Sequence, residues 1–360
     1  MQKEKAIVLT HGLLDTPLAK TAHGLLRGTE RFEVLALIDY KHPDKDAGDV
    51  MDGRGRQVPV FASVEDYFLH QTEQPIWCVV GVALPGGKLP DDFRGELKSA
   101  IARKCSIVCG LHTFLSEDPE FSRLAEEEGV RLLDVRKPKP RHELHFWSGE
   151  IFTVKQPIIA VLGTDCAIGK RTTCRFIMEM CARHHLHAEM IYTGQTGWMQ
   201  GYRHGFIFDS TVNDFISGEL EHAVVACARE SNPDLILLEG QSALRNPTGP
   251  AGAEYLLSAN AKAVILHHAP GRVCYEGTEA LGYQIRSIES EIELIRLYDA
   301  EVIGITLNGE HLTLEALQTY RDDLQQRLGI PVALPLEEGV EALLPAIRAR
   351  LKKGGEWVNG

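Results

Sequence analysis

The stretch Pro157-Ile-Ile-Ala-Val-Leu162, followed at once by Gly163-Thr-Asp-Cys-Ala-Ile-Gly-Lys-Arg-Thr-Thr173, decides the fold of the second part of this chain. Its first half is apolar and contains β-branched residues, which is typical of a buried strand. Its second half carries two glycines and leads into a helix predicted over residues 174–184. A strand, a glycine-bounded loop, a lysine and a helix in this order predict a phosphate-binding loop, or P-loop.

Each residue type in this loop can contribute to holding a phosphate group. Glycine can adopt backbone angles that other residues resist, so successive amides can point at an anion. The start of the helix adds unpaired N–H groups and a partial positive charge, and the lysine adds a full charge. A threonine hydroxyl there can bond a phosphate oxygen or Mg²⁺. We therefore expect the cofactor site to comprise Gly163, Thr164, Asp165, Cys166, Ala167, Gly169, Lys170, Arg171, Thr172 and Thr173.

The loop departs from the common G-x-x-x-x-G-K-[ST] pattern in two ways. Five residues separate Gly163 from Gly169, as in dethiobiotin synthetase and related P-loop enzymes, and Arg171 stands between Lys170 and the first threonine. Because Arg171 displaces the hydroxyl that usually holds Mg²⁺, the pattern disfavours MgATP hydrolysis but retains phosphate binding. A glycine-rich turn without a ligand would explain the glycines, but neither Lys170 nor the paired threonines.

Short apolar runs alternate with helical stretches along the whole chain, which is the pattern of parallel α/β folds. A chain of 360 residues is long enough for two hydrophobic cores. The stretch Arg136-Lys-Pro-Lys-Pro-Arg141 can form neither a helix nor a central strand, so it indicates a linker. We predict an α/β protein with a Rossmann-like domain over residues 1–140 and a P-loop NTPase-like parallel-sheet domain over residues 141–360. The strands expected in the first part are Ala6–Thr10, Val34–Ile38, Trp77–Val80, Ser106–Cys109 and Arg131–Asp134.

Asp39 follows one of these strands at the point where a Rossmann domain holds its ribose-binding acid. The first turn, Thr10-His-Gly-Leu-Leu-Asp-Thr16, has one glycine instead of the G-x-G-x-x-G fingerprint. Dinucleotide binding is therefore disfavoured. Asp39 is then a turn residue, in a domain that supports the second domain or completes its site.

Polar residues also follow the predicted strands of the second part, at the edge of the sheet where the P-loop lies. Glu239 follows the apolar run 233–238 and is the strongest candidate for a general base or a metal ligand. An unpaired charge at a buried strand end is costly, so a carboxylate there favours a functional role. Asp214, near a predicted helix start, is a second candidate, although residues 209–214 are also explained by helix capping. We expect substrate contacts from the small polar loop 193–197 and the segment after Glu239, namely Thr193, Gln195, Thr196, Gln241 and Arg245. Tight turns with incidental polarity are the competing interpretation.

His267 and His268 end another predicted strand, and as neighbours they point to opposite faces of the sheet. They cannot easily ligate one metal, so we predict no metal site. One of them is a candidate catalytic group, although a histidine satisfied within the fold is the commoner outcome. Asn308 ends the next strand, where nucleotide enzymes often contact a base; a simple turn residue is the alternative.

The composition limits the partners. A net charge of −12 and a pI near 5.7 disfavour nucleic acid, and no run approaches 18 apolar residues. We therefore expect neither nucleic-acid nor membrane partners, but a small-molecule substrate and a location in the cytoplasm. The eight cysteines form no Cys-x-x-Cys pair, which predicts reduced, partly buried thiols. An enzyme of this size is also expected to form a homo-oligomer.

Three motifs together resemble a known family: Gly163-Thr-Asp-Cys-Ala-Ile-Gly-Lys170 with Thr172-Thr173, Thr193-Gly-Gln-Thr-Gly197, and Glu239-Gly-Gln241. They are similar to the D-glutamate N-acetyltransferase-like family, long catalogued as a domain of unknown function. The similarity covers most of the chain. In that family a Rossmann-like N-terminal domain precedes a P-loop-type C-terminal domain, which is the order predicted above.

The resemblance implies transfer of an acetyl group from acetyl-CoA to the amine of a D-amino acid, with D-glutamate as the reference substrate. The P-loop would then hold the phosphates of CoA, a use that requires no cleavage of a phosphoanhydride and accommodates Arg171. A base must deprotonate the acceptor amine, and Glu239 or Asp214 is the group to test. Two alternatives stay open: an ATP- or GTP-dependent kinase or ligase that needs Mg²⁺, and a nucleotide-binding regulatory protein without turnover.

Overall fold

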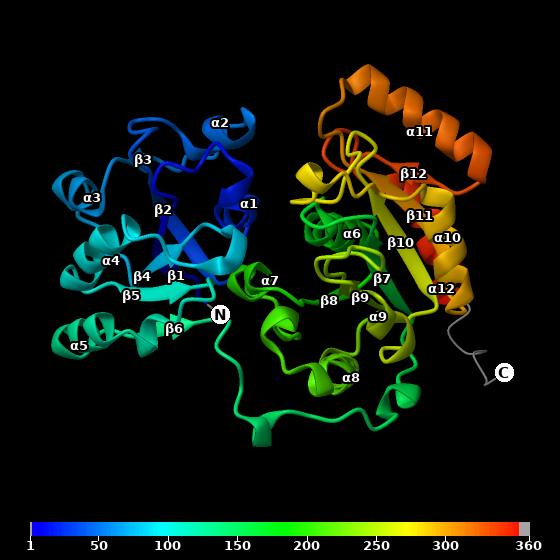
Figure 1. The fold of residues 1–360 in the computed structure, drawn as a ribbon, viewed down its shortest axis with the longest axis horizontal. Helices are drawn as coiled ribbons and strands as arrows, with labels where there is room; N and C mark the ends of the chain where they lie inside the picture. The colour runs from blue at the N-terminus through cyan, green and yellow to red at the C-terminus, as the bar shows by residue number, and fades with distance from the viewer. Residues whose placement is uncertain (1, 353–360) are drawn as a thin grey trace. The chain divides into compact units, whose positions relative to one another are not determined.

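The computed structural model describes residues 2–352 and divides the chain into two compact units (Figure 1). The first unit contains the chain up to Pro138 together with Gln195–Tyr202. The second unit contains Lys139–Gly194 and the chain from Arg203 onward. The division near residue 138 lies close to the predicted boundary, but the assignment of residues 195–202 to the first unit differs from the predicted continuous domains.

The first unit is built on a six-stranded parallel sheet with the order β3-β2-β1-β4-β5-β6. The order reverses between β1 and β4, as in a Rossmann-like doubly wound sheet. Its strands are β1 (Glu4–Leu9), β2 (Phe32–Ile38), β3 (Val60–Phe61), β4 (Trp77–Val80), β5 (Ser106–Cys109) and β6 (Leu132–Asp134). Its helices are α1 (Lys20–Leu26), α2 (Ala47–Asp52), α3 (Val64–His70), α4 (Phe93–Ala102), α5 (Pro119–Glu128) and α7 (Gln195–Gln200).

The second unit has its own six-stranded parallel sheet, with the order β12-β11-β10-β7-β9-β8 (Figure 1). Connections between parallel strands cross the sheet in a right-handed sense. Connections that run in opposite directions along this sheet therefore lie on its opposite faces. The strands are β7 (Ile158–Gly163), β8 (Ala188–Ile191), β9 (Leu235–Glu239), β10 (Ala263–His268), β11 (Glu301–Leu307) and β12 (Val332–Ala333). The helices are α6 (Lys170–Arg183), α8 (Asn213–Ser231), α9 (Ala253–Leu257), α10 (Ile288–Leu297), α11 (Leu314–Leu328) and α12 (Leu344–Lys352).

The two parallel sheets confirm the predicted fold class. Every strand of four or more residues corresponds to an apolar run identified in the sequence, whereas the two-residue edge strands β3 and β12 were not predicted. The segment 193–197, expected as a loop, instead leads into helix α7. The reason is packing within the first unit, where Met199 is fully buried in the core and the guanidinium of Arg31 lies 3.9 Å from the ring centre of Trp198.

Asp39, at the end of β2, is fully buried and holds the loop after β1. One carboxylate oxygen accepts hydrogen bonds from the hydroxyl of Thr10 at 2.7 Å and from the amides of Gly12 and Leu14 at 2.8 and 3.1 Å. Burial alone would raise the pKa of this carboxyl, but its hydrogen bonds hold the pKa below the ordinary value. Asp39 therefore corresponds to the turn residue of the sequence analysis rather than to the ribose-binding acid, and its carboxylate is bonded by the protein's own backbone.

Replacing Asp39 with alanine is expected to lower the free energy of unfolding by about 3 kcal/mol, because a buried donor left without its acceptor costs about 1–3 kcal/mol. Denaturant unfolding followed by circular dichroism measures the effect. The exposed Asp91→Ala is the matched control. Since the folded pKa is depressed, the stabilisation is present at neutral pH and is lost as the pH falls through that pKa. Equal stability of the two variants would contradict the assignment.

The predicted linker, residues 136–141, spans the division between the two units, and the chain from Lys139 to Ile151 runs along helix α8. The buried carboxylate of Glu219 accepts hydrogen bonds from the backbone and ring nitrogens of His145, and from Lys139 at 2.7 Å. Glu221 accepts from Ser148 and from the amide of Ile151 in the same way. The segment contains only the short 3₁₀ helices Arg141–Glu143 and Glu150–Thr153, and these hydrogen bonds fix it to the second unit.

Two further expectations concern the whole chain. All eight cysteines are unpaired thiols, six of them buried, as predicted. Among residues 2–352, we find no helix with the length and apolar character that a membrane span requires.

Candidate functional site

The predicted P-loop connects β7 to α6. Gly169 has a φ of 116°, a left-handed conformation that favours glycine, and it directly precedes the first helical residue, Lys170. A Cβ atom on Gly163 would lie 2.9 Å from Cδ1 of Ile168 and 3.0 Å from Cδ of Lys170, so a larger residue would require these two side chains to shift. The first N–H groups of α6 have no partners within the helix and are available to an anion.

Lys170 is buried at this point, with 6% of its surface exposed. Its Nζ donates hydrogen bonds to the carbonyl oxygens of Asp165 at 2.6 Å and Ser242 at 2.8 Å. Burial lowers the pKa of Lys170 to about 8, against the opposing influence of Cys166 and Asp165. A buried ammonium whose hydrogen bonds within the described residues go to carbonyl oxygens rather than to a carboxylate is a favourable partner for a phosphate.

Asp165 braces the loop rather than facing a ligand. Its fully buried carboxylate accepts hydrogen bonds from the side chain of Asn246 at 3.0 Å and from the guanidinium of Arg272 at 3.0 Å. Arg272 also donates to the carbonyl oxygen of Cys166 at 2.9 Å and pairs with Glu310 at 2.7 Å. The loop is therefore tied to two segments that follow β9 and β10.

The two histidines that end β10 are satisfied within the fold. Nε2 of His267 donates to the carbonyl oxygen of Ile168 at 2.7 Å, so Nδ1 is an acceptor for the hydroxyls of Thr173 and Thr306 at 3.1 and 2.5 Å. Nδ1 of His268 lies 2.9 Å from the hydroxyl of Thr164. Burial lowers the pKa of His267 to about 3 and that of His268 to about 4, so both rings are neutral.

Asn308 supports the same loop. Its amide nitrogen donates to the carbonyl oxygen of Ile168 at 2.7 Å, and its amide oxygen accepts from the backbone of Glu310 at 2.8 Å. Both ends of this side chain are used within the protein, which corresponds to the turn interpretation. Thr172 is half-buried in the first turn of α6, outside the histidine network that holds Thr173.

Glu239 ends β9, the strand beside the P-loop strand, and is 4% exposed. One carboxylate oxygen accepts from the amide of Thr193 at 3.0 Å, and the other lies 3.8 Å from Nη1 of Arg171. Burial raises the pKa of the Glu239 carboxyl, while Arg171 and the amide of Thr193 act in the opposite direction. A carboxyl with a raised pKa, close to the P-loop and to one arginine, is well suited to take up a proton.

Thr193 and Gln241 extend the site around Glu239. The hydroxyl of Thr193 donates to the carbonyl oxygen of Glu239 at 2.6 Å and accepts from the amide of Gln241 at 3.0 Å. The backbone N–H of Gln241 donates to the hydroxyl of the fully buried Tyr255 at 3.2 Å. The structure thus brings Glu239, Thr193 and Gln241 together, as the sequence predicts for neighbouring strand ends.

The remaining four predicted site residues take no part in the hydrogen bonds just described. Gln195 and Thr196 belong to α7 of the first unit, where the hydroxyl of Thr196 lies 3.2 Å from that of Thr21. Arg245 donates to the side chain and carbonyl of Ser290 at 2.6 and 2.8 Å, at the start of α10. Asp214 is exposed in the first turn of α8, where its charge favours the helix dipole.

Three residues of the site were not predicted: Ser242, Asn246 and Arg272. Arg272 follows a strand that ends in polar residues, so its charge was a usable signal. Asn246 adjoins Arg245, which was selected for its charge, and a loop gives no periodicity from which to decide which neighbour turns inward. Ser242 contacts Lys170 through its backbone carbonyl, which no side-chain pattern reveals.

Comparisons with known proteins agree with this architecture. Residues 145–344 match the P-loop domain of a family described as a domain of unknown function, DUF1611, and residues 40–138 match its Rossmann-like N-terminal domain. A crystal structure of a DUF1611 family protein from Anabaena variabilis superposes with a TM-score of 0.86 at 27% identity, covering 96% of this chain and 100% of that one.

Two curated relatives carry the name D-glutamate N-acetyltransferase. One from a Pseudoalteromonas species is 29% identical over 273 residues, which is 74% of this chain and 79% of the relative. One from Tritonibacter scottomollicae is 29% identical over 280 residues, which is 75% of this chain and 80% of the relative. The resemblance found in the three motifs is thereby confirmed, and the chain belongs to the DUF1611 family, with its Rossmann-like and P-loop domains in the same order.

Proposed function

We propose that this protein transfers an acetyl group from acetyl-CoA to the amine of a D-amino acid such as D-glutamate, with the P-loop holding the phosphates of CoA. The observation that carries the proposal is a buried lysine in the P-loop and a buried carboxylate at the end of the neighbouring strand, with Arg171 3.8 Å from that carboxylate. The names of the two curated relatives support the reaction.

The loop fits a nucleotide diphosphate. It offers a buried ammonium at Lys170 and the amides at the start of α6, and Gly163 leaves the room that the lysine side chain needs. Arg171 occupies the place of the usual Mg²⁺-binding hydroxyl, and an acetyl transfer requires no phosphoanhydride cleavage. CoA, whose phosphates are bound but not cleaved, suits this loop better than a nucleotide that must be hydrolysed.

The chemistry falls to Glu239. An ammonium cannot attack a thioester, so the carboxylate takes a proton from the acceptor amine, whose nitrogen then attacks the carbonyl carbon. The carbon–sulfur bond breaks, the nitrogen gives up a second proton as the amide forms, and the leaving thiolate takes up that proton to become free CoA. Arg171, 3.8 Å from Glu239, carries a charge that favours the ionised carboxylate and hence its role as a base.

An ATP- or GTP-dependent enzyme is the second candidate, because Glu239 follows the strand beside the P-loop strand, a position where P-loop enzymes hold a metal-binding acid. It would require Mg²⁺ and release phosphate. Under that reaction Arg171 would replace the metal-binding hydroxyl without an evident substitute.

The test is calorimetric titration of the whole chain with acetyl-CoA and, separately, with ATP plus Mg²⁺, followed by a free-thiol assay with D-glutamate. Acetyl-CoA binding and thiol release that depends on the amino acid are expected. Binding of ATP alone, with no thiol released for any amine tried, would refute the acetyltransferase and favour the nucleotide enzyme.

A further inference from the structure

The second unit contains a cavity of about 350 Å³ that is joined to the P-loop through two of its wall residues. His268 and Arg272 form part of its wall, and the same two side chains contact Thr164, Asp165 and Cys166 of the loop. The rest of the wall comes from the segment before α10, from the start of that helix and from α11. Ligand pockets measure about 300–1,000 Å³, so this cavity suits a fragment of nucleoside size rather than an entire CoA molecule.

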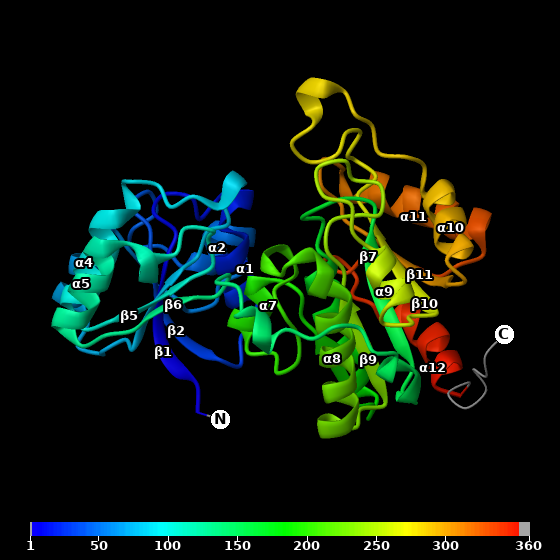
Figure 2. The same ribbon diagram turned by 60° about the horizontal axis from the view of Figure 1, so that its bottom comes forward.

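Three arginines line this cavity, but their charges are not equally available. Arg272 is bonded to Asp165 and Glu310, and Arg327 pairs with Glu289 at the start of α10. Arg286 is exposed and forms no ion pair with another residue of the described chain. It stands just before α10 in the sequence. In Figure 2 the segment between β10 and α10 projects from the second sheet. Arg286 is therefore the cation in this cavity that is free to meet an anion.

The cavity also offers aromatic surface. The rings of His268 and Tyr320 lie 6.1 Å apart at an angle of 37°, and both line the wall. The imidazole is neutral, since burial lowers the pKa of His268 to about 4. Aromatic side chains provide surfaces on which nucleic-acid bases stack. The arginine can bind a phosphate and the two rings can stack on a base, which are the contacts that a phosphorylated nucleoside requires.

The order of the strands shows on which side of the P-loop this cavity lies. Along the sheet the order is β11-β10-β7-β9, so the cavity at the end of β10 and Glu239 at the end of β9 lie on opposite sides of the P-loop strand. In CoA the diphosphate likewise lies between a 3′-phosphorylated adenosine and the arm that ends in the thioester. A diphosphate held on the P-loop would therefore let one arm enter the cavity while the other extends toward Glu239.

We infer that this cavity binds the 3′-phosphoadenosine end of CoA and that Arg286 contacts the 3′-phosphate. The inference rests on the proposed function and adds its specificity: the 3′-phosphate distinguishes CoA from ADP and ATP, which lack it. Arg286 determines which ligand binds and takes no part in the proton transfer, because it lies on the opposite side of the P-loop from the carboxylate that takes the proton.

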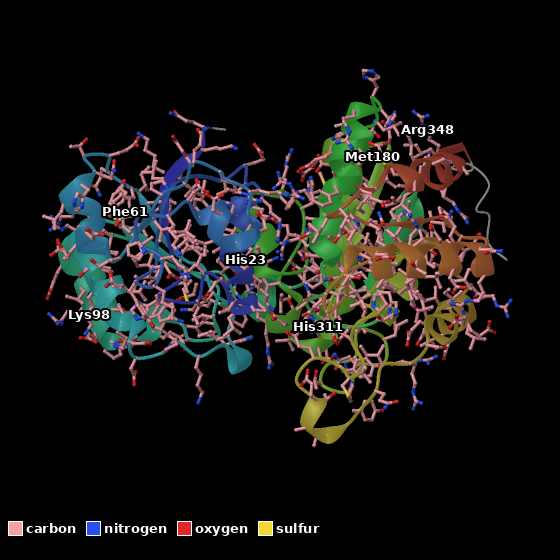
Figure 3. All side chains as sticks on the ribbon, turned by 90° about the horizontal axis from the view of Figure 1, so that it is seen from above. His23, Phe61, Lys98, Met180, His311 and Arg348 are labelled. Carbon is pink, nitrogen blue, oxygen red and sulfur yellow. The ribbon has the colours of Figure 1, made fainter. Side chains whose placement is uncertain are left out.

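The experiment compares CoA with dephospho-CoA by calorimetry on the whole chain. The wild type is expected to bind CoA about tenfold or more tightly than dephospho-CoA, the range for one charge-assisted hydrogen bond. Arg286→Ala should lower the affinity for CoA to that for dephospho-CoA while leaving the latter unchanged. Tyr320→Leu should weaken both ligands by a similar factor. Arg348→Ala, an exposed arginine of α12 labelled in Figure 3, should change neither.

Different failures have different meanings. If the wild type binds and turns over acetyl-CoA but does not distinguish CoA from dephospho-CoA, this inference is wrong and the acetyltransferase stands. The same holds if Arg286→Ala weakens both ligands equally, or if Arg348→Ala has the effect expected of Arg286→Ala. If CoA does not bind at all, the proposed function and this inference fail together.

Discussion

Glu239→Gln is expected to lower kcat by about 10²- to 10⁴-fold, the usual contribution of a positioned general base. The amide keeps the size of the side chain and an oxygen that can accept from Thr193, but it cannot take a proton. Acetyl-CoA affinity should stay nearly unchanged, because the phosphates bind at the P-loop. A thiol-release assay under saturating substrate measures the loss, and calorimetry measures the retained binding.

Two controls sharpen this result. Glu293→Gln, exposed on α10, should leave the rate unchanged. Asp214→Asn tests the other carboxylate proposed from the sequence, which lies exposed in the first turn of α8. If Asp214→Asn abolished turnover while Glu239→Gln did not, the base would be Asp214. In the wild type the rate should fall on acidification through the raised pKa of Glu239, and the Gln variant should lack this limb of the profile.

Lys170→Met is expected to weaken acetyl-CoA binding by about 10- to 100-fold, because a hydrogen bond to a charged group contributes about 1.5–3 kcal/mol. Methionine fills a similar volume without the ammonium, so the loop loses its charge and its bonds to Asp165 and Ser242. Calorimetry measures the affinity, and a thermal melt separates lost binding from lost folding. The exposed Lys155→Met is the matched control.

The pH dependence gives an independent check on Lys170. Its pKa in the free protein is about 8, so the ammonium is present below that pH and is lost above it. A bound phosphate favours the charged form, and affinity should therefore decline as the pH rises through 8, by up to tenfold per unit. Acetyl-CoA has no free thiol to ionise in this range. Lys170→Met should show no such decline; a decline of the same size in the variant would exclude Lys170 as its source.

The fold was predictable where local patterns are long enough to carry a signal. β7 and β9 are continuous apolar runs ending in polar residues, and such runs identify parallel strands. β3 and β12 have two residues each and are defined only by pairing with β2 and β11. Helix α7 was missed for a related reason: its residues fold against the first unit, and nothing in residues 195–200 alone indicates that partner.

The candidate site likewise contains residues that the sequence could predict and residues that it could not. The P-loop and Glu239 could be found because each combines a strand with a chemically distinctive end. The bonds that brace the loop join Asp165 to Arg272, and His267 to Thr306, across long stretches of sequence. Which polar residue faces a ligand and which serves the backbone depends on these pairings. Asn308 was correctly placed at its strand end, yet only the structure reveals that both its amide atoms are already bonded.

Because residues 195–202 belong to the first unit, that unit can complete its core only after this later part of the chain has been synthesised. A ribosome releases the last strand of the first sheet, β6, well before α7, and makes β7, α6 and β8 in between. At about 5–20 residues per second, the first unit waits roughly 3–13 s for the helix that places Met199 in its core. During that interval the nascent chain exposes apolar surface that the finished protein covers, which is the kind of surface that molecular chaperones bind.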